Sequence, residues 1–429
     1  MSEAKRKGEK EVKTLFKNAR ILTMKDENII EGDLVVIDTR IAYIGNDSSK
    51  YAPFDRVVEC NKNVLMPGFK NAHAHSAMVF IQNKPTNINL QDWLFTFVFP
   101  REAKLIPSDI YHLNKVAYLE YVRGGITACF DHYFFPLEGA KAAEEFGMRT
   151  LLLGTPDPGK VLIDNLERNY NFFNDKKDGL VSYTVGFHAE YTADKALLED
   201  TKKAIVKIKC PFYTHISETK TEVEGCIERH QKTPLKFLHE EGLFQYGGGG
   251  FHCIYLTDEE VKICRDNHLS IVSCPGSNLY LQSGTAPLKK YLDNGVNVAL
   301  GTDGPASNEG LSMFREMQLA VYNNKDIPAF EILKMATVNA ARAMNMLNAD
   351  VLEEGKYADI IMVDLASLNN GKVDNFINNL VYNGRQENIK LTMINGKILY
   401  EDGKFYLNES VDKINEKLQE ISRRIENEL

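Results

Sequence analysis

The chain has 429 residues, of which 44% are hydrophobic and 26% charged, which suits a large α/β domain with a smaller accessory domain. Its formal net charge of −8 disfavours nucleic acid and anionic membrane surfaces as partners. No segment approaches the ~20 apolar residues that span a bilayer, and residues 1–13 are too charged for a secretory signal. The seven cysteines are scattered without C-x-x-C spacing, which favours reduced thiols in a cytoplasmic protein.

Short apolar β-strands are predicted at both ends of the chain. They cover residues 15–22, 33–37 and 41–45 near the start, and residues 358–364 and 391–400 near the end. A terminal helix is predicted from about residue 410, because Ile414, Leu418, Ile421 and Ile425 recur at helical spacing. We therefore expect a small β-sandwich domain formed by residues 1–63 and 346–429, with the helix at its end.

The middle of the chain, residues 64–345, alternates apolar strand segments with helical patterns. Eight such strand segments end near residues 73, 131, 154, 188, 215, 253, 273 and 301. Eight β/α units over about 280 residues match a (β/α)8 TIM barrel in number and length. A doubly wound open sheet is the alternative, but no glycine-rich phosphate turn follows the first strand. The sequence therefore predicts an α/β fold with a barrel at residues 64–345.

Two histidines two positions apart, His73 and His75, follow the apolar run at residues 64–67. Side chains at positions i and i+2 of a strand point to the same face. Two imidazoles held there can bind one divalent cation, whereas without a metal they would need other polar partners. The pair alone favours a metal only modestly over a structural role.

Further histidines and an aspartate follow other predicted strands. His188 follows the fourth, His215 the fifth, His252 the sixth and Asp303 the eighth. Catalytic residues of a barrel gather at the carboxyl ends of its strands. Five of the ten histidines in the chain therefore fall at such positions, which strengthens the prediction of a single site.

Ligand chemistry suggests how the roles divide at this site. A mononuclear centre needs three or four nitrogen or oxygen ligands and an open position for water. The predicted ligands are His73, His75, His215 and Asp303. The alternative for Asp303 is an ordinary Asp-Gly turn. One metal is preferred to two, because the fourth strand, residues 181–191, offers no lysine to bridge a second ion.

Two further residues are candidates for proton chemistry. Glu218 follows His215 by three positions and could shuttle a proton to the substrate, or simply cap a helix. His252 is predicted to orient the water or act as an electrophile, and the alternative is a satisfied core histidine. Asp303 is also expected to help deprotonate the water.

The chain resembles the amidohydrolase superfamily, and in particular its aminohydrolase branch that deaminates adenosine derivatives and related heterocycles. The matching motifs are residues 67–75, 215–218, 273–278 and 301–308, in the order of the family. Residues 89–94, followed by Glu102, resemble the stretch where methylthioadenosine/S-adenosylhomocysteine deaminases hold the nucleoside. The resemblance implies that Trp93 packs on the substrate, Glu102 binds ribose hydroxyls and His188 contacts the purine or ribose. A core aromatic is the alternative for Trp93.

The chain also departs from those deaminases. They carry arginines near the third strand end that meet the amino-acid carboxylate, and here no arginine precedes Arg168 in that region. Lys160 is the candidate replacement, although it lacks the bidentate fork of arginine. Residues 188–191 also differ from the usual pattern, which puts S-adenosylhomocysteine in doubt as a substrate.

The predicted function is that of a metal-dependent aminohydrolase that removes an amino group from a purine-like heterocycle or nucleoside and releases ammonia. Zinc is the first choice of divalent metal, with iron or manganese as alternatives. Alternative substrates are guanine, a pterin, cytosine or a triazine, the last including chlorohydrolysis. A metal-free scaffold is a third hypothesis, which predicts broken ligand positions. The expected partner is a small heterocycle, and the resemblance implies a homo-oligomer.

Overall fold

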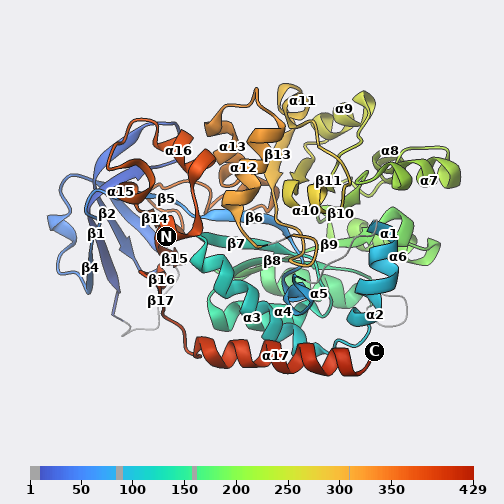
Figure 1. Ribbon diagram of the computed structural model, residues 1–429, viewed down its shortest axis with the longest axis horizontal. Coiled ribbons are helices and arrows are strands. Elements are labelled where there is room, and N and C mark those ends of the chain that lie inside the picture. The colour runs from blue at the N-terminus through green and yellow to red at the C-terminus, as the bar shows by residue number, and fades with distance from the viewer. Residues whose placement is uncertain (1–9, 84–89, 157–161, 309) are drawn as a thin grey trace.

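The computed structural model describes residues 10–83, 90–156, 162–308 and 310–429 (Figure 1). Its central element is a sheet of eight parallel strands in chain order. These strands are β6 (Phe69–Ala74), β7 (Ile126–Asp131), β8 (Arg149–Gly154), β9 (Val181–Ala189), β10 (Phe212–Ile216), β11 (Gly248–His252), β12 (Ser270–Ser273) and β13 (Asn297–Leu300). An isolated parallel bridge between Ala74 and Asp303 joins the first strand to the end of the last. The predicted (β/α)8 barrel is thereby confirmed.

Helices cover the outside of the barrel (Figure 1). They include α3 (Pro107–Arg123), α4 (Pro136–Phe146), α5 (Ile163–Asn174), α6 (Lys195–Ile208), α7 (Lys220–His230), α8 (Pro234–Glu240), α9 (Asp258–Asp266), α11 (Leu288–Asp293), α12 (Met313–Asn323) and α13 (Ala329–Met335). Two further helices lie at the ends of the barrel: α10 (Pro275–Tyr280) at the carboxyl end and α14 (Val338–Ala343) at the amino end. Because helices lie outside and side chains fill the interior, the barrel strands are buried on both faces. This burial on both faces explains why the sequences of the barrel strands are almost continuously apolar.

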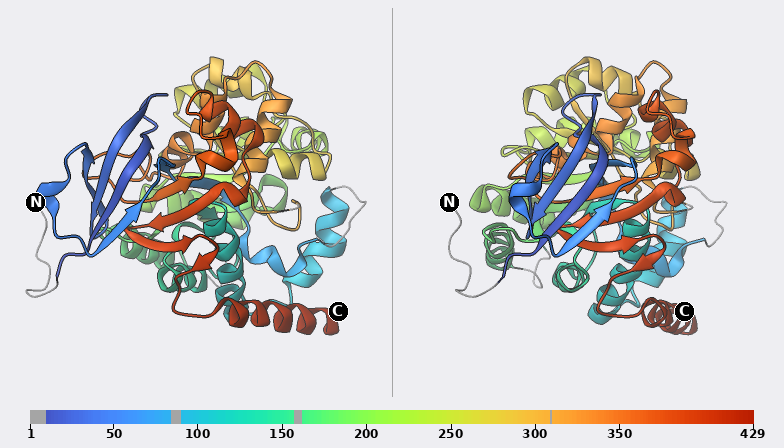
Figure 2. Two further views of the ribbon diagram at one scale, coloured as in Figure 1. Left: turned by 60° about the vertical axis from the view of Figure 1, so that its left-hand side comes forward. Right: turned by 90° about the vertical axis from the view of Figure 1, so that its left-hand side faces the viewer.

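The chain ends form a second sheet, in which N-terminal and C-terminal strands lie side by side (Figure 2). Its nine described strands are β1 (Lys13–Leu22), β2 (Ile29–Ile37), β3 (Arg40–Gly45), β4 (Arg56–Glu59), β5 (Val64–Pro67), β14 (Ile360–Val363), β15 (Ile389–Ile394), β16 (Lys397–Glu401) and β17 (Lys404–Phe405). The apolar run at residues 64–67 belongs to this sheet, since β5 pairs with β1 and β14. The domain limits at residues 63 and 345 stay a prediction.

Further helices lie outside the repeating barrel units. They are α1 (Leu90–Trp93), α2 (Phe99–Glu102), α15 (Leu365–Asn369), α16 (Phe376–Asn383) and α17 (Val411–Asn427). The predicted terminal helix, α17, begins where the Ser410 hydroxyl accepts a hydrogen bond from the Lys413 amide, and it runs beside α3 (Figure 1). Its buried side chains, Ile414, Ile421 and Ile425, form the apolar face expected from their spacing.

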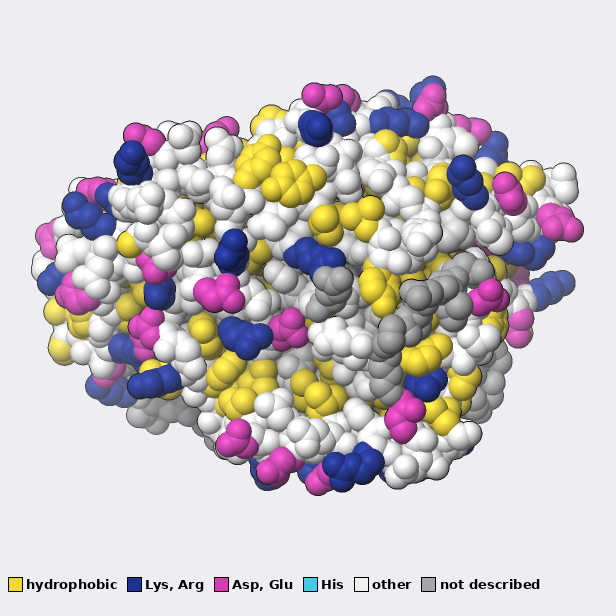
Figure 3. Space-filling model, in the orientation of Figure 1, with side chains coloured by type: hydrophobic (Ala, Val, Ile, Leu, Met, Phe, Trp, Pro, Cys, Tyr) yellow, Lys and Arg dark blue, Asp and Glu magenta, His cyan; other side chains and the backbone are white. Residues whose placement is uncertain are grey.

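The surface carries both signs of charge. On the face shown in Figure 3, acidic and basic side chains are interspersed over the barrel and the small sheet. Among the described residues, none of the helices has the length and apolar content that crossing a membrane requires.

Candidate active site

Four predicted ligands converge where the barrel strands end. The Nε2 atom of His215 lies 3.1 Å from Nε2 of His73 and 3.3 Å from Nε2 of His75. The Oδ1 atom of Asp303 lies 3.2 Å from each of the latter two nitrogens. Ligands about 2.0–2.1 Å from a metal at tetrahedral angles stand roughly 3.3 Å apart. The spacing of these four atoms therefore fits one divalent ion.

Hydrogen bonds to backbone carbonyls orient two of the imidazoles. Nδ1 of His75 donates to the carbonyl of His132 at 2.5 Å, and Nδ1 of His215 donates to the carbonyl of His188 at 2.6 Å. A carbonyl can only accept, so each Nδ1 carries the proton and each Nε2 keeps its lone pair free. Such outer contacts commonly hold histidine ligands of metals in place.

Hydrogen bonds from two serines to the Oδ2 atom hold the carboxylate of Asp303 in place. Oδ2 accepts hydrogen bonds from Ser277 Oγ at 2.5 Å and Ser307 Oγ at 2.9 Å, which leaves Oδ1 toward the imidazoles. The backbone of Asp303 has a φ of 60°, in the left-handed region that few non-glycine residues adopt. Strain of this kind persists where the surrounding structure fixes it, and it is common at functional sites.

The protonation states of His73, His215 and Asp303 suit metal ligation. Burial lowers the pKa of His73 to about 3 and holds the pKa of His215 well below its usual range. Burial alone would raise the pKa of Asp303, but the adjacent imidazoles of His73 and His75 hold that pKa well below the ordinary value. Two neutral imidazoles and an ionised carboxylate are thus available, which are the forms that bind a cation.

Glu218 and His252 lie beside the cluster as a facing pair. The Oε1 atom of Glu218 accepts a hydrogen bond from Ser283 at 2.9 Å, and its Oε2 lies 3.8 Å from Nε2 of His252. Nδ1 of His252 is 2.8 Å from Oδ1 of Asn278, to which it donates. Burial raises the pKa of the Glu218 carboxyl, which favours its protonated form. A carboxyl of this kind can hold and transfer a proton.

The predicted substrate-binding residues lie in different surroundings. The ring of His188 is 4.7 Å from that of His215, so His188 borders the cluster. Glu102, near the end of α2, accepts a hydrogen bond from the Tyr133 hydroxyl at 2.6 Å, and burial raises the pKa of its carboxyl. Trp93 is only 3% exposed and belongs to the apolar core. Lys160 lies outside the described residues.

One residue of this site, His132, is absent from the sequence prediction. It follows β7 directly, and its ring lies 5.3 Å from that of His75 and 5.4 Å from that of His215. The rule that found the other histidines, a polar residue at the carboxyl end of a barrel strand, also applies here. The predicted second strand ends at Asp131, and the histidine one position beyond it is not among the residues predicted for the site.

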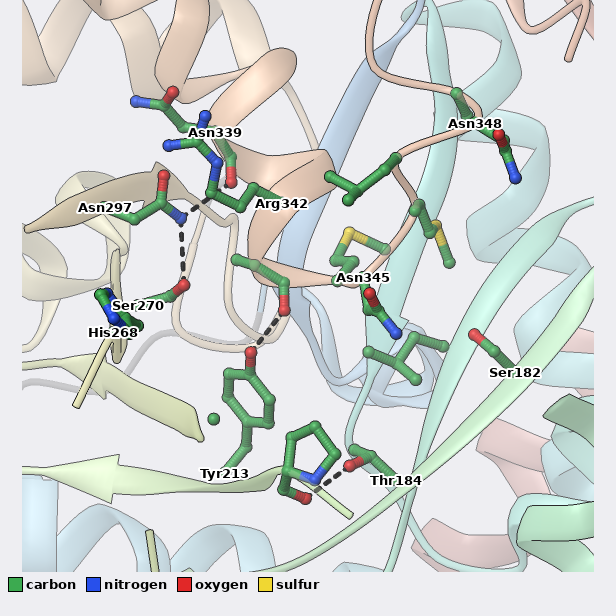
Figure 4. Close-up of a pocket in the computed structure, with 18 of the residues that line it drawn as sticks. Ser182, Thr184, Tyr213, His268, Ser270, Asn297, Asn339, Arg342, Asn345 and Asn348 are labelled. Carbon is green, nitrogen blue, oxygen red and sulfur yellow. Dashed lines mark hydrogen bonds between the residues drawn. The ribbon is translucent and has the colours of Figure 1, made fainter. Parts of the chain in front are cut away.

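A cavity of about 730 Å³ opens at the opposite end of the barrel (Figure 4). Its wall includes the first residues of several strands, among them Ser270 and Asn297, and the Tyr213 hydroxyl donates to the Ala343 carbonyl there. None of the predicted site residues lines this cavity. The predicted site residues therefore lie away from this cavity, at the carboxyl ends of the strands.

At the carboxyl end of the barrel, three histidines and an aspartate bring their ligand atoms within 4.8 Å of one another, as a group that could hold a metal ion. Residues 64–399 match the model of the amidohydrolase family, and the chain belongs to that family.

Two relatives in sequence and one solved structure match nearly the whole chain. A 5-methylthioadenosine/S-adenosylhomocysteine deaminase of Caldanaerobacter subterraneus subsp. tengcongensis is 36% identical over 402 residues, covering 90% of this chain and 93% of the relative. A 5'-deoxyadenosine deaminase of Methanosphaera stadtmanae is 34% identical, covering 91% and 94%. The crystal structure of an adenosine deaminase from Xanthomonas campestris with bound zinc superimposes with a TM-score of 0.88 at 26% identity, covering 97% and 99%.

Proposed function

We propose that this protein is a metal-dependent aminohydrolase that removes the amino group of an adenosine-type nucleoside, such as methylthioadenosine, and releases ammonia. The observation that carries the proposal is the convergence of His73, His75, His215 and Asp303 on one position, with Glu218 beside them. The names of the relatives support the nucleoside as substrate class. They favour it over guanine, pterins, cytosine and triazines.

The metal would be held by the three Nε2 atoms and by Oδ1 of Asp303. A divalent ion bound there supplies a Lewis acid that lowers the pKa of water toward neutrality. We propose zinc, because a zinc-bound deaminase shares the fold, while iron and manganese also suit three nitrogens and one carboxylate. Metal analysis of the purified protein distinguishes the three.

Three side chains of the protein, Asp303, His252 and Glu218, would carry out the proton transfers. Water adds to the ring carbon that bears the amino group, and Asp303 and His252 help to take up the proton it loses. Glu218 donates a proton to the ring nitrogen next to that carbon, so that negative charge does not build up on the ring. The ionised Glu218 then takes the proton of the added hydroxyl and passes it to the amino group, so that the carbonyl forms as the carbon–nitrogen bond breaks and ammonia leaves. The proton held by Asp303 and His252 returns to Glu218 and resets the site.

A substrate panel tests this function. The metal-loaded protein is incubated with adenosine, methylthioadenosine, 5'-deoxyadenosine, S-adenosylhomocysteine, guanine, cytosine, a pterin and an aminotriazine, and ammonia is measured. We expect turnover of at least one adenosine compound, and loss of that turnover after chelation. Turnover of guanine, cytosine, a pterin or the triazine alone would contradict the nucleoside assignment. A cytoplasmic homo-oligomer remains part of the proposal, which fractionation and light scattering would test.

A further inference from the structure

His132 occupies a fixed position beside the proposed metal ligands. Its backbone N–H donates to the Ala74 carbonyl at 2.8 Å, and its own carbonyl accepts the hydrogen bond from His75 Nδ1. Both backbone groups are therefore tied to the segment that carries the His-x-His pair. A side chain mounted on such a rigid backbone is well placed to contact a ligand.

The imidazole of His132 lies beside the cluster but stands apart from the position where the four proposed ligands converge. Its ring centre is 5.3 Å from that of His75, 5.4 Å from that of His215 and 6.4 Å from that of His188. None of its nitrogens belongs to the group of four converging ligand atoms. His132 is only 8% exposed, so its side chain is packed inside the molecule beside these rings.

Two polar side chains near His132 are already hydrogen-bonded, whereas Nδ1 of His132 is not. The Tyr133 hydroxyl donates to Glu102, and Nδ1 of His188 lies 3.3 Å from the Thr192 hydroxyl. Nδ1 of His132 is buried, and no partner for it exists within the described part of the chain. Buried polar atoms rarely stay unpaired, because losing water without a replacement hydrogen bond is costly.

We infer that His132 is a substrate-binding residue that hydrogen-bonds the heterocycle close to the reacting carbon and so helps to select which ring is accepted. This inference rests on the proposed function. A neutral imidazole donates from one nitrogen and accepts at the other. It therefore matches a heterocycle that presents a ring nitrogen beside an exocyclic amino group. Its position beside His75 and His215 places it at the heterocycle end of the substrate.

Three substitutions test the inference. His132→Leu removes both ring nitrogens, His132→Asn places an amide near the position of Nδ1, and His132→Gln places one near Nε2. All three leave the backbone carbonyl that orients His75 intact, so each protein should keep one equivalent of metal. His239→Gln, on the outer helix α8, is the matched control and should behave as wild type.

We expect His132→Leu to lose at least about 10-fold in kcat/KM for the adenosine compound and to bind inosine at least about 10-fold more weakly. One of the two amide variants should recover most of both losses. Unchanged values in His132→Leu would overturn the inference, as would equal loss of metal in all three variants, which marks a structural role. A wild-type protein that turns over no adenosine compound would overturn the proposed function and this inference together.

A second measurement covers the case in which the leucine variant does not fold. Ring ¹⁵N signals of histidine are recorded for the wild-type protein, and the signal missing in His132→Gln identifies His132. Addition of inosine should shift that signal. A His132 signal that stays in place while inosine binds would overturn the inference.

Discussion

The backbone N–H of Asp303 donates to the carbonyl of His73 at 3.0 Å, while the Oδ1 atom of Asp303 lies 3.2 Å from Nε2 of His73. The same two residues therefore close the barrel and belong to the cluster of proposed metal ligands. A Cβ atom at Gly301 would stand 2.7 Å from the His73 backbone nitrogen, so only glycine permits this close approach. The contacts that close the barrel therefore also bring the Asp303 carboxylate to the His73 imidazole.

The first prediction concerns Asp303 as a ligand. Asp303→Asn keeps the size of the side chain but removes the charge that complements a cation. We expect sub-stoichiometric metal and a fall in turnover of at least about 100-fold. Metal analysis and ammonia release measure the two effects. Asp266→Asn, at an exposed pair with Arg265, is the control, and full metal content in Asp303→Asn would contradict the assignment.

The second prediction separates proton transfer from metal binding. Glu218→Gln should keep its metal but lose about 10²–10⁴-fold in kcat, because the amide cannot pass a proton between water and the ring. Metal content and steady-state kinetics are measured on the same preparation. Glu224→Gln, on the exposed face of α7, is the control. Wild-type turnover in Glu218→Gln would show that the shuttle role is wrong.

The third prediction concerns the buried ion pair that joins the barrel to the second sheet. Nε of Arg149, the first residue of β8, lies 2.6 Å from Asp359 Oδ2, and both side chains are at most 4% exposed. Arg149→Met leaves a buried carboxylate unpaired, so we expect a loss of about 3–5 kcal/mol in the free energy of unfolding. Urea denaturation measures this loss. The double variant Arg149→Met/Asp359→Leu should recover part of it, and an additive further loss would contradict the explanation.

The fourth prediction is a pH dependence of stability. Burial raises the pKa of the Glu316 carboxyl to about 7, against an ordinary value of 4.5, although Gly276 and Asn308 donate hydrogen bonds to it. Because the folded protein holds this proton more tightly, its stabilising contribution is complete below pH 4.5 and is lost as the pH rises to about 7. The stability of the wild type relative to Glu316→Gln should therefore fall over that interval. Urea denaturation at several pH values would refute this if the difference stayed constant.

The fifth prediction uses Trp93, the only tryptophan of the chain. If it packs on the substrate, saturation with inosine should change the intrinsic fluorescence, and Trp93→Phe should bind inosine more weakly. Calorimetry measures the binding independently of the fluorescence. Inosine binding with neither effect would assign Trp93 to the apolar core alone.

The sequence predicted the barrel and the converging residues well because both depend on local patterns. Each barrel strand is a short apolar run, and each of His215, His252 and Asp303 stands at the end of one. The carboxyl ends of such strands must meet, so the cluster followed without knowledge of distances.

Other features depend on contacts between distant segments. Arg149 and Asp359 are 210 positions apart, and nothing near either residue marks the partner. The run at residues 64–67 has the composition of a barrel strand, but it pairs in the small sheet, because apolar sequence does not specify which sheet a strand joins. The two serines on Asp303 Oδ2, Ser277 and Ser307, likewise required the folded structure.

The most direct test of the central claim is a metal titration of the metal-free protein, followed by ammonia release from an adenosine compound. Because His73, His75, His215 and Asp303 form one set of converging ligand atoms, we predict that activity rises linearly with added zinc and levels off at one equivalent per chain. Full activity without metal, or activity that requires a second equivalent, would contradict the account.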